Sequence, residues 1–101
     1  MSDKRIDLSP EAILEIEEAF DWYLERSPGA AEAFLVEIDQ GLSLIATSPG
    51  LWPLFEAGAR KYVLPNFPYN LIYREAADKI DEIKVVAVAH HKRRPRYWIG
   101  R

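Results

Sequence analysis

Apolar and polar positions alternate at the start of the chain and then change to a helical period. Ile6 and Leu8 alternate with polar neighbours over residues 4–8, which predicts a short first strand. Apolar side chains then recur at three- and four-residue spacing along residues 10–26 and again along residues 28–47. This spacing is typical of amphipathic helices, so we predict two consecutive helices that form a helical hairpin.

Start and stop signals mark the ends of both predicted helices. Residues 9–11 (Ser-Pro-Glu) supply a hydroxyl acceptor, a proline suited to the first turn and an acidic side chain. Residues 27–29 (Ser-Pro-Gly) repeat the start signal, and residues 48–50 (Ser-Pro-Gly) end the second helix. Gly41 lies inside that helix, where glycine costs about 1 kcal/mol against alanine, so we expect another element to approach closely there.

Strand-like periods return in the second half of the chain. Residues 60–64 and 69–74 alternate apolar and polar side chains and are separated by a turn around Asn66. Residues 83–89 form a continuous apolar run, which indicates a strand that is buried on both faces and lies inside the sheet. We therefore predict three consecutive antiparallel strands.

The apolar connection after the second helix, residues 51–55, is expected to be irregular. Its Trp52 and Phe55 are predicted to cover the open end of the core. The resulting order is strand-helix-helix-strand-strand-strand, an α+β fold in which a helical hairpin packs on a small, mostly antiparallel sheet. At 101 residues and 11.6 kDa the chain is long enough for one core, so we predict a single domain over residues 1–101.

Composition agrees with a folded domain and excludes several protein classes. Apolar residues make up 49% and charged residues 29% of the chain, which is too balanced for an intrinsically disordered protein. The longest nearly uncharged stretch, residues 41–55, is interrupted by prolines and is shorter than the roughly 20 apolar residues of a membrane span. Residues 1–7 carry no apolar signal region and the chain has no cysteine, so we expect a cytoplasmic protein without disulfides.

Charge divides the chain into two unlike halves. Residues 1–55 carry three Lys or Arg against eleven Asp or Glu, whereas residues 56–101 carry ten against five. The net charge of −3 therefore hides an acidic first half and a basic second half. The basic half predicts contact with a local anionic partner, either a nucleic acid or an acidic protein segment.

Five short motifs follow one another along the chain. Each is weak alone, because helix caps and alternating strands occur in many proteins. Their order within 101 residues is more specific and covers nearly the whole chain. The motifs are Leu-Ser-Pro-Glu-Ala at residues 8–12, Ser-Pro-Gly-Ala-Ala at 27–31, Ser-Pro-Gly at 48–50, Tyr-Asn-Leu-Ile-Tyr-Arg at 69–74 and Val-Ala-His-His-Lys-Arg-Arg-Pro at 88–95.

Together these motifs resemble the RelE/ParE superfamily of toxins from bacterial type II toxin–antitoxin modules. The resemblance implies a cognate antitoxin that neutralises the chain, and it implies no cofactor. It also implies one of two activities. RelE-like proteins are ribosome-dependent endoribonucleases that cut mRNA without a metal, and ParE-like proteins inhibit DNA gyrase.

The residues at the catalytic positions of the nucleases favour the ParE branch. RelE-like nucleases carry a catalytic arginine where this chain has Asn70, which cannot stabilise a phosphorane as a cation. Their preceding strand carries two lysines two positions apart, and beside Lys61 the second position here is Val63. The Ile-Tyr-Arg sequence at residues 72–74 and the Val-x-Val-x-His sequence at 86–90 are similar to the ParE branch, where no catalytic set is expected.

Three functions stay open at this point. A ParE-like toxin that acts on gyrase is favoured, followed by a RelE-like mRNA endoribonuclease and by a non-toxic module that binds only its antitoxin or itself. An acidic total charge disfavours extensive contact with RNA phosphates. A homodimer and a heterotetramer with the antitoxin are both left open, and no membrane partner is expected. The catalytic residues of the nuclease alternative are Lys61, Arg74, His91 and Tyr97.

Two groups of residues are candidates for protein contacts. The basic exit after the last predicted strand carries cations next to aromatic side chains, which can stack on a partner or pack back on the sheet. The apolar connection after the second helix offers side chains for an antitoxin peptide that folds on docking. The antitoxin-binding candidates are Leu51, Trp52, Leu54 and Phe55, and the target-binding candidates are Arg60, Arg74, His90, Lys92, Arg93, Arg94, Arg96, Tyr97 and Trp98.

Other polar clusters have ordinary structural explanations. His90 and His91 point to opposite faces of a strand and have no third ligand at a recognisable spacing, so no metal site is predicted. Tyr69 and Tyr73 share one strand face and are expected in the core. The carboxylates expected on a solvated helix face, without an acid–base role, are Glu15, Glu18, Asp21 and Glu25.

Overall fold

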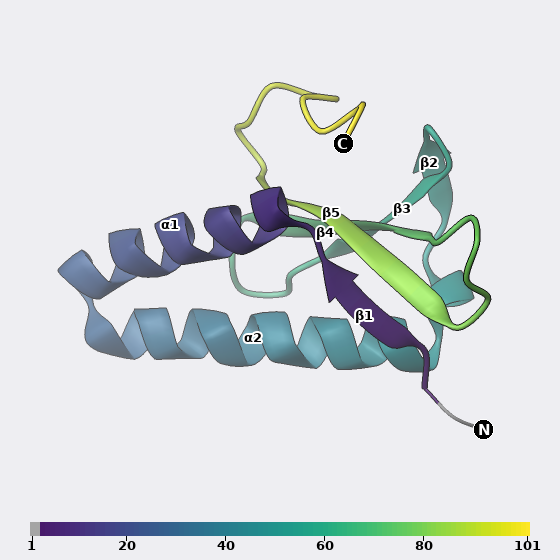
Figure 1. Cartoon of the computed structure of the whole chain (residues 1–101). Helices are drawn as coiled ribbons and strands as arrows, with labels where there is room; N and C mark the ends of the chain where they lie inside the picture. Colours follow the sequence, from purple (N-terminus) through teal and green to yellow (C-terminus); the bar gives the residue numbers. More distant parts are fainter. Residues whose placement is uncertain (1–2) are drawn as a thin grey trace.

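A helical hairpin covers one face of a five-stranded sheet, and the C-terminal segment crosses the other face (Figure 1). The computed structural model describes residues 3–101; Met1 and Ser2, which begin the N-terminal stretch considered above, lie outside the described residues. No helix in the described part of the chain is long and apolar enough to span a membrane. The elements are β1 (Arg5–Leu8), α1 (Pro10–Arg26), α2 (Pro28–Thr47), a 3-10 turn (Pro49–Leu51), β2 (Leu54–Glu56), β3 (Ala59–Val63), β4 (Tyr69–Glu75) and β5 (Glu82–His90).

Both helices begin where the sequence predicts. Ser9 Oγ accepts a hydrogen bond from the Ala12 amide at 3.0 Å, and Ser27 Oγ accepts one from the Ala30 amide at 3.3 Å. These bonds satisfy amides that the first turn of a helix leaves free. Ser27 also ends α1, because its own amide donates to the Tyr23 carbonyl. A single residue therefore separates the two helices and fixes them as a hairpin.

The strand order is β1-β5-β4-β3-β2; β1 runs parallel to β5, and the other neighbouring pairs are antiparallel. The sheet has one strand more than the sequence pattern predicts, because β2 forms within the connection expected to be irregular. Ala57 and Gly58 have φ values of 50° and 72°, as a two-residue turn between β2 and β3 requires. Alanine rarely adopts positive φ, so Ala57 conceals this turn from sequence inspection.

The main core lies between the hairpin and the sheet. Tyr69 and Tyr73 both belong to it, which confirms that they share one face of β4. Gly41 of α2 faces the same core, where a Cβ would lie 2.8 Å from Tyr62 Cε1 and 2.9 Å from Leu71 Cδ1. The expected close approach at this glycine is therefore confirmed, and it brings α2 directly onto β3 and β4.

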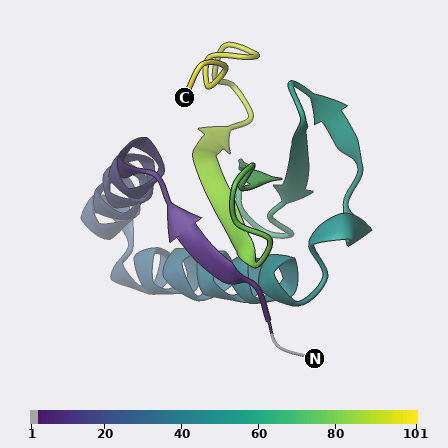
Figure 2. The ribbon, with the colours of Figure 1, turned by 45° about the vertical axis from the view of Figure 1, so that its right-hand side comes forward.

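A smaller apolar cluster, the open-face cluster, lies on the side of the sheet away from the helices. It combines apolar side chains of β3, β4 and β5 with Trp98 of the C-terminal segment. Figure 2 shows the ribbon of this segment above the sheet, while α2 lies below. Trp52 covers the end of the main core as predicted, with its ring 5.0 Å from that of Tyr62. The same prediction is wrong for Phe55, whose ring lies 5.6 Å from Trp98, because β2 alternates its side chains between the two faces.

A β-bulge in β5 sets which of its side chains face each layer. The register with β4 shifts between Ile72 and Tyr73, which leaves Val86 as an extra residue. Val86 and Ala87 therefore both belong to the open-face cluster, and Val88 returns to the main core. This burial on both faces confirms the prediction from the continuous apolar run. Because β1 ends before the bulge, the β5 edge beyond it has no neighbouring strand among residues 3–101.

Candidate functional site

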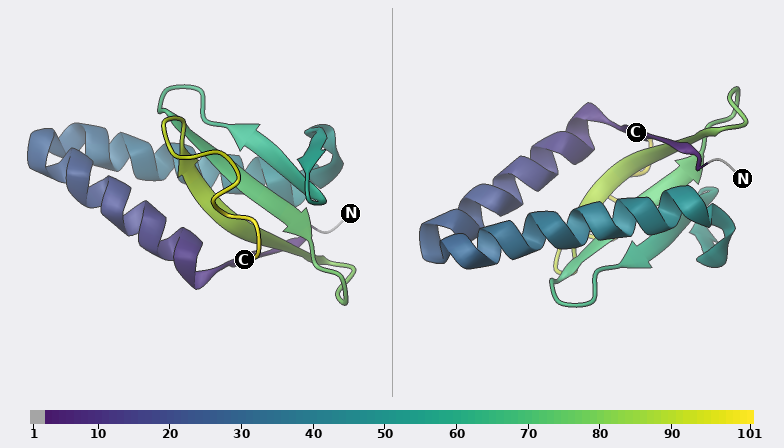
Figure 3. Two further views of the ribbon diagram at one scale, coloured as in Figure 1. Left: turned by 90° about the horizontal axis from the view of Figure 1, so that it is seen from above. Right: turned by 90° about the horizontal axis from the view of Figure 1, so that it is seen from below.

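The C-terminal segment, residues 91–101, folds back over the open face of the sheet (Figure 3). Trp98 anchors it, since the side chain is only 4% exposed and belongs to the open-face cluster with Ile72 and Ala89. Backbone bonds from Ile99 to Arg96 and from the chain end to Trp98 tighten the loop. Burying an indole contributes several kcal/mol. The segment is thus a fixed part of the fold and not a solvated tail.

Glu15, in the second turn of α1, ties this segment to the helix. Its Oε2 accepts a hydrogen bond from the Tyr97 hydroxyl at 2.6 Å, and the Arg101 guanidinium donates to both carboxylate oxygens at 3.1 and 3.3 Å. Its Oε1 also accepts from the Val88 amide at 2.9 Å, on the β5 edge that lacks a neighbouring strand. The side chain is 12% exposed, so the prediction of a solvated carboxylate is wrong for Glu15, whereas Glu18 is exposed as predicted.

Tyr97 lies between two cations. The Arg93 guanidinium carbon is 4.2 Å from the centre of its ring, and that of Arg101 is 4.9 Å away. Burial is the largest cause that raises the pKa of Tyr97, and the hydrogen bond to Glu15 and the charge of that carboxylate raise it further. The hydroxyl therefore keeps its proton and acts as a donor. Cation–π contacts of this kind fix the guanidinium of Arg93 against the ring.

The basic segment, defined as Lys92, Arg93, Arg94 and Arg96, is exposed on the turns between β5 and Trp98. Backbone bonds from Arg93 to His90 and from Tyr97 to Arg94 hold these turns, and Arg96 adopts a left-handed φ of 67°. Arg96 Nε lies 3.4 Å from Glu56 Oε2 in an exposed ion pair. The structure thus brings Lys92, Arg93, Arg94 and Arg96 together on one ordered surface with Tyr97 beside them. The prediction that Trp98 contacts a target is wrong, because its side chain is buried against the sheet, and His90 faces the helix side.

Two other target-binding candidates lie apart from the basic segment. Arg60 donates to the Trp52 carbonyl at 2.6 Å, beside the turn that follows α2. Arg74 donates to the Arg101 carbonyl at 2.7 Å and so holds the end of the chain. Both guanidinium groups are engaged in the fold, and the structure does not unite them with Arg93.

The nuclease candidates are partly brought together. Lys61, His91 and Tyr97 line one hollow of about 280 Å³ under the C-terminal segment, and Arg74 is not among its lining residues. The Tyr97 hydroxyl is bonded to Glu15, as described above. At the position expected for a catalytic arginine, Asn70 Oδ1 lies 3.2 Å from His91 Nε2. The hollow thus brings together cations and an amide, but the Tyr97 hydroxyl is already engaged in a hydrogen bond to Glu15.

The two adjacent histidines lie on opposite faces, as predicted. The His90 ring meets the Tyr69 ring edge-on at 5.0 Å on the helix side, while His91 lies beside Asn70 on the open face. Burial lowers the pKa of His90, and the charges of His91 and Lys92 lower it further. Its Nδ1 accepts the Lys92 amide hydrogen at 3.0 Å. Within residues 3–101 no three His, Asp or Glu side chains gather as a possible metal site.

The antitoxin-binding candidates form an apolar border at the far edge of the sheet. Leu51 and Leu54 are 72% and 62% exposed, and Phe55 is 40% exposed. Trp52 is half-buried against Tyr62. Since β2 is the last strand in the sheet order, no strand in the described part of the chain pairs with its outer backbone edge.

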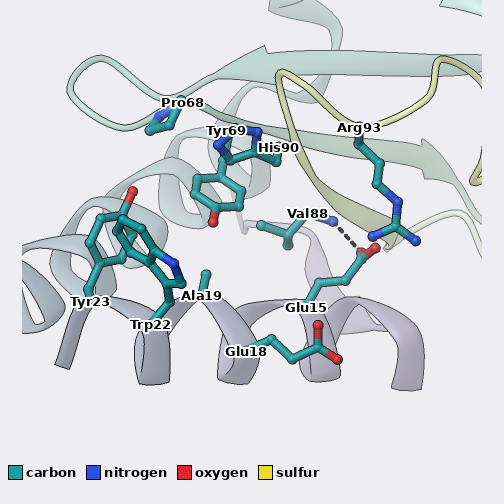
Figure 4. Close-up of a pocket in the computed structure, with 10 residues that line it drawn as sticks. All are labelled: Glu15, Glu18, Ala19, Trp22, Tyr23, Pro68, Tyr69, Val88, His90 and Arg93. Carbon is teal, nitrogen blue, oxygen red and sulfur yellow. Dashed lines mark hydrogen bonds between the residues drawn. The ribbon is translucent and has the colours of Figure 1, made fainter. Parts of the chain in front are cut away.

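A groove of about 550 Å³ runs between α1 and the ends of β4 and β5 (Figure 4). Aromatic rings from both layers line it, and Glu15 and Arg93 close one end. No local pattern in the sequence predicts this groove, because its walls come from segments far apart in the chain. The side chains drawn in Figure 4 are Glu15, Glu18, Ala19, Trp22, Tyr23, Pro68, Tyr69, Val88, His90 and Arg93.

Two residues at the centre of the site, Glu15 and Arg101, were not predicted as functional. Glu15 belongs to a helix with several carboxylates, and its spacing from them gives no distinguishing signal. Arg101 is 86 positions away from Glu15, and no local pattern links the two. The useful signal was indirect: aromatic residues directly after a basic run indicate a segment that packs back on the fold.

Comparison with known proteins identifies the family. The family model described as "ParE toxin of type II toxin-antitoxin system, parDE" matches residues 6–95. A solved chain of the "Chromosomal ParDE TA system from P. aeruginosa" is similar in structure, with a TM-score of 0.73 and 15% identity over 86% of this chain and 95% of that chain; at this identity it supports the fold alone. The comparison with curated proteins gives no match. Because the family model covers most of its length, the chain belongs to the ParE toxin family of type II toxin–antitoxin systems.

Proposed function

We propose that this ParE-family toxin inhibits DNA gyrase in the cytoplasm and that its basic segment contacts an acidic surface of that enzyme. The observation that carries the proposal is the ordered state of the basic segment. The two residues that follow it hold it in place: Trp98 is buried against the sheet, and Tyr97 is bonded to Glu15 of α1. The arginine side chains stay exposed. Residues that are already fixed lose little conformational entropy on binding, which favours affinity.

The chemistry of the segment suits a carboxylate-rich partner. Arginine presents a planar fork of donors that matches a carboxylate, and a cluster of cations speeds encounter with a negative surface. The acidic residues of the first half of the chain lie mainly in α1 and α2, whereas the exposed cations of the basic segment lie on the turns that follow β5. This separation of charge orients the toxin as it approaches a partner.

Metal-free mRNA cleavage is the second candidate, because Lys61 and His91 share one hollow on the open face. Cleavage by a ribose hydroxyl requires a base, an acid and a cation for the phosphorane. The raised pKa of Tyr97 keeps its hydroxyl protonated, so no phenolate is at hand to act as the base, and the Arg74 guanidinium is already bonded to the Arg101 carbonyl. These contacts favour the gyrase inhibitor over the nuclease.

A supercoiling assay and a transcript assay on the same purified protein separate the two candidates. We expect the protein to inhibit gyrase and to leave ribosome-bound transcripts intact in primer extension, with Lys61→Ala as active on gyrase as the unchanged chain. Ribosome-dependent cuts that disappear in Lys61→Ala would assign the protein to the nuclease branch. Absence of both gyrase inhibition and cleavage, together with normal growth on induction, would leave the antitoxin-binding module.

For the antitoxin we propose a site on the apolar border at β2. An extended segment can pair with the free outer edge of β2 and bury Leu51 and Leu54, which are large apolar side chains exposed to solvent. Leu54→Asp should weaken the co-purified complex with the antitoxin. Ile80→Asp is the matched control, because Ile80 is 87% exposed on the distant turn between β4 and β5. Light scattering on the complex distinguishes a heterodimer from a heterotetramer, and equal binding by both variants would exclude the β2 site.

A further inference from the structure

We propose that Glu15 is a positioning residue for the basic segment, which it holds in binding geometry through Tyr97 and Arg101. The proposal rests on the proposed role of that segment in target inhibition and adds a residue of α1 to it. Glu15 itself lies behind the segment and is 12% exposed, so it acts on the target through other side chains.

Three parts of the fold meet at this one carboxylate. Helix α1 supplies Glu15, the free edge of β5 supplies the Val88 amide, and the C-terminal segment supplies the Tyr97 hydroxyl and the Arg101 guanidinium. Arg101 Nη1 also donates to the Val86 carbonyl at 3.1 Å. Glu15 and Arg101 thus satisfy edge groups of β5 that a neighbouring strand would otherwise bind.

The position of Arg93 depends on this arrangement. The hydrogen bond to Glu15 fixes the Tyr97 ring, and that ring is the surface on which the Arg93 guanidinium stacks at 4.2 Å. Figure 4 shows the Arg93 side chain reaching toward Glu15 from the C-terminal segment. Loss of the carboxylate therefore removes the support of Arg93 as well as the partner of Arg101.

The end of the C-terminal segment, after the basic residues, is held in place by the ion pair between Arg101 and Glu15. The Arg101 side chain is 18% exposed, and without Glu15 this largely buried charge would lose its ion pair. Such a charge is strongly unfavourable, so the segment should move into solvent instead of keeping its present place. Of the main core, Val88 takes part in these contacts through its backbone amide, and glutamine can still accept from that amide, so the sheet and hairpin are expected to stay folded while the segment opens locally.

Glu15→Gln tests the proposal, and Glu18→Gln is its matched control. The glutamine side chain can still accept from the Val88 amide but loses the ion pair with Arg101, whereas Glu18 is an exposed carboxylate one turn further along the same helix. The toxin, purified after co-expression with its antitoxin, is measured for trypsin cleavage after Lys92, Arg93 and Arg96, for thermal unfolding, and for inhibition of gyrase supercoiling.

We expect Glu15→Gln to speed cleavage at these sites about tenfold and to raise the concentration for half-inhibition of gyrase about tenfold, as loss of one charged hydrogen bond implies. In Glu15→Gln the melting temperature of the main unfolding transition and binding to the antitoxin should stay unchanged. Glu18→Gln should match the unaltered chain in all assays. A simple loss of stability would instead lower melting and antitoxin binding together. If Glu15→Gln does not fold, Arg101→Gln removes the same ion pair from the other side and is taken through the same assays.

The outcomes distinguish this proposal from the one on which it rests. If Arg93→Ala and Arg94→Ala together leave gyrase inhibition intact, both proposals are overturned. If that pair abolishes inhibition while Glu15→Gln inhibits and resists trypsin like the unaltered chain, the role of the basic segment stands and the role of Glu15 is overturned.

Discussion

Glu15 and Tyr97, 82 positions apart in the chain, are joined by a hydrogen bond of 2.6 Å between a carboxylate and a phenol. This bond connects the most acidic helix of the protein to its most basic segment. It also links the N-terminal and C-terminal regions, because Glu15 lies near the start of α1 and Tyr97 lies in the turns of the C-terminal segment. The stability of the C-terminal segment and its function are therefore expected to depend on the same few contacts.

Tyr97→Phe should lower the free energy of local opening of the C-terminal segment by about 1 kcal/mol, because it removes one donor and leaves a carboxylate oxygen of Glu15 with one bond fewer. The rate of trypsin cleavage after Lys92, Arg93 and Arg96 measures this. In combination with Glu15→Gln the effects should be less than additive, since both changes remove the same bond. Full additivity would contradict a direct interaction between the two side chains.

Replacement of Arg93, Arg94 and Arg96 by alanine should abolish growth inhibition and leave folding intact. These side chains are exposed, and both the ion pair of Arg96 with Glu56 and the stacking of Arg93 on Tyr97 are surface contacts, so the change in stability should stay within about 1 kcal/mol. Growth curves after induction and thermal melts of the purified variant check the two parts. A triple variant that is as toxic as the unaltered chain would assign the segment to solvent or to antitoxin contact alone.

Trp98→Ala should impair both folding and toxicity. The side chain is 4% exposed in the open-face cluster, and truncating a buried aromatic costs about 3–5 kcal/mol. A much lower midpoint in denaturant is expected together with loss of growth inhibition. Ile99→Ala is the control, because the Ile99 side chain, next to Trp98 in the sequence, is 40% exposed and should tolerate truncation.

Gly41→Ala should lower the free energy of unfolding by about 1 kcal/mol. A methyl group there would overlap the Tyr62 ring and Leu71 in the main core, and this cost exceeds the gain in helix propensity. Gly50→Ala, where a Cβ meets nothing within 4 Å, should have little effect. Equal stability of the two variants in urea would show that the side chains packed against α2 can move to accommodate a methyl group at position 41.

His90 should make folding sensitive to mild acid. Burial, together with the charges of His91 and Lys92, lowers its pKa below the ordinary value of 6.5, so the unfolded chain takes up a proton at higher pH than the folded one. Its contribution to stability is complete above that value and is lost as the pH falls below 6.5. His90→Gln should flatten the pH dependence of unfolding in this range, and an unchanged profile would show that the ring is equally free in both states.

The elements with local signals were predictable from the sequence. Ser9 and Ser27 mark the helix starts by a chemistry that needs only neighbouring residues, and the run before His90 indicates an interior strand. β2 was missed because its turn relies on Ala57 at positive φ, which the surrounding sheet imposes. Local pattern therefore gave the layers of the fold, and tertiary contacts decided the extra strand.

Only the part of the candidate site that is formed by consecutive residues was predictable from the sequence. The basic residues and the aromatics after them are contiguous, so their clustering is visible in the sequence. The opposite half of the site is Glu15, which differs from Glu18 only by facing the unpaired edge of β5. That edge exists because β1 is short and β5 is bulged, which are properties of strand register and not of composition.

The bulge in β5 also determines how the strand tolerates a change in length. Val86 and Ala87 both face the open side, so removal of Val86 would leave a regular strand in which Val88, Ala89 and His90 keep their present layers. Removal of Val88 would instead turn each later side chain of the strand to the opposite layer, so that His90 would face the open side. Deletion of the bulged residue should therefore disturb the exit of the chain from the sheet far less than deletion of a residue after it.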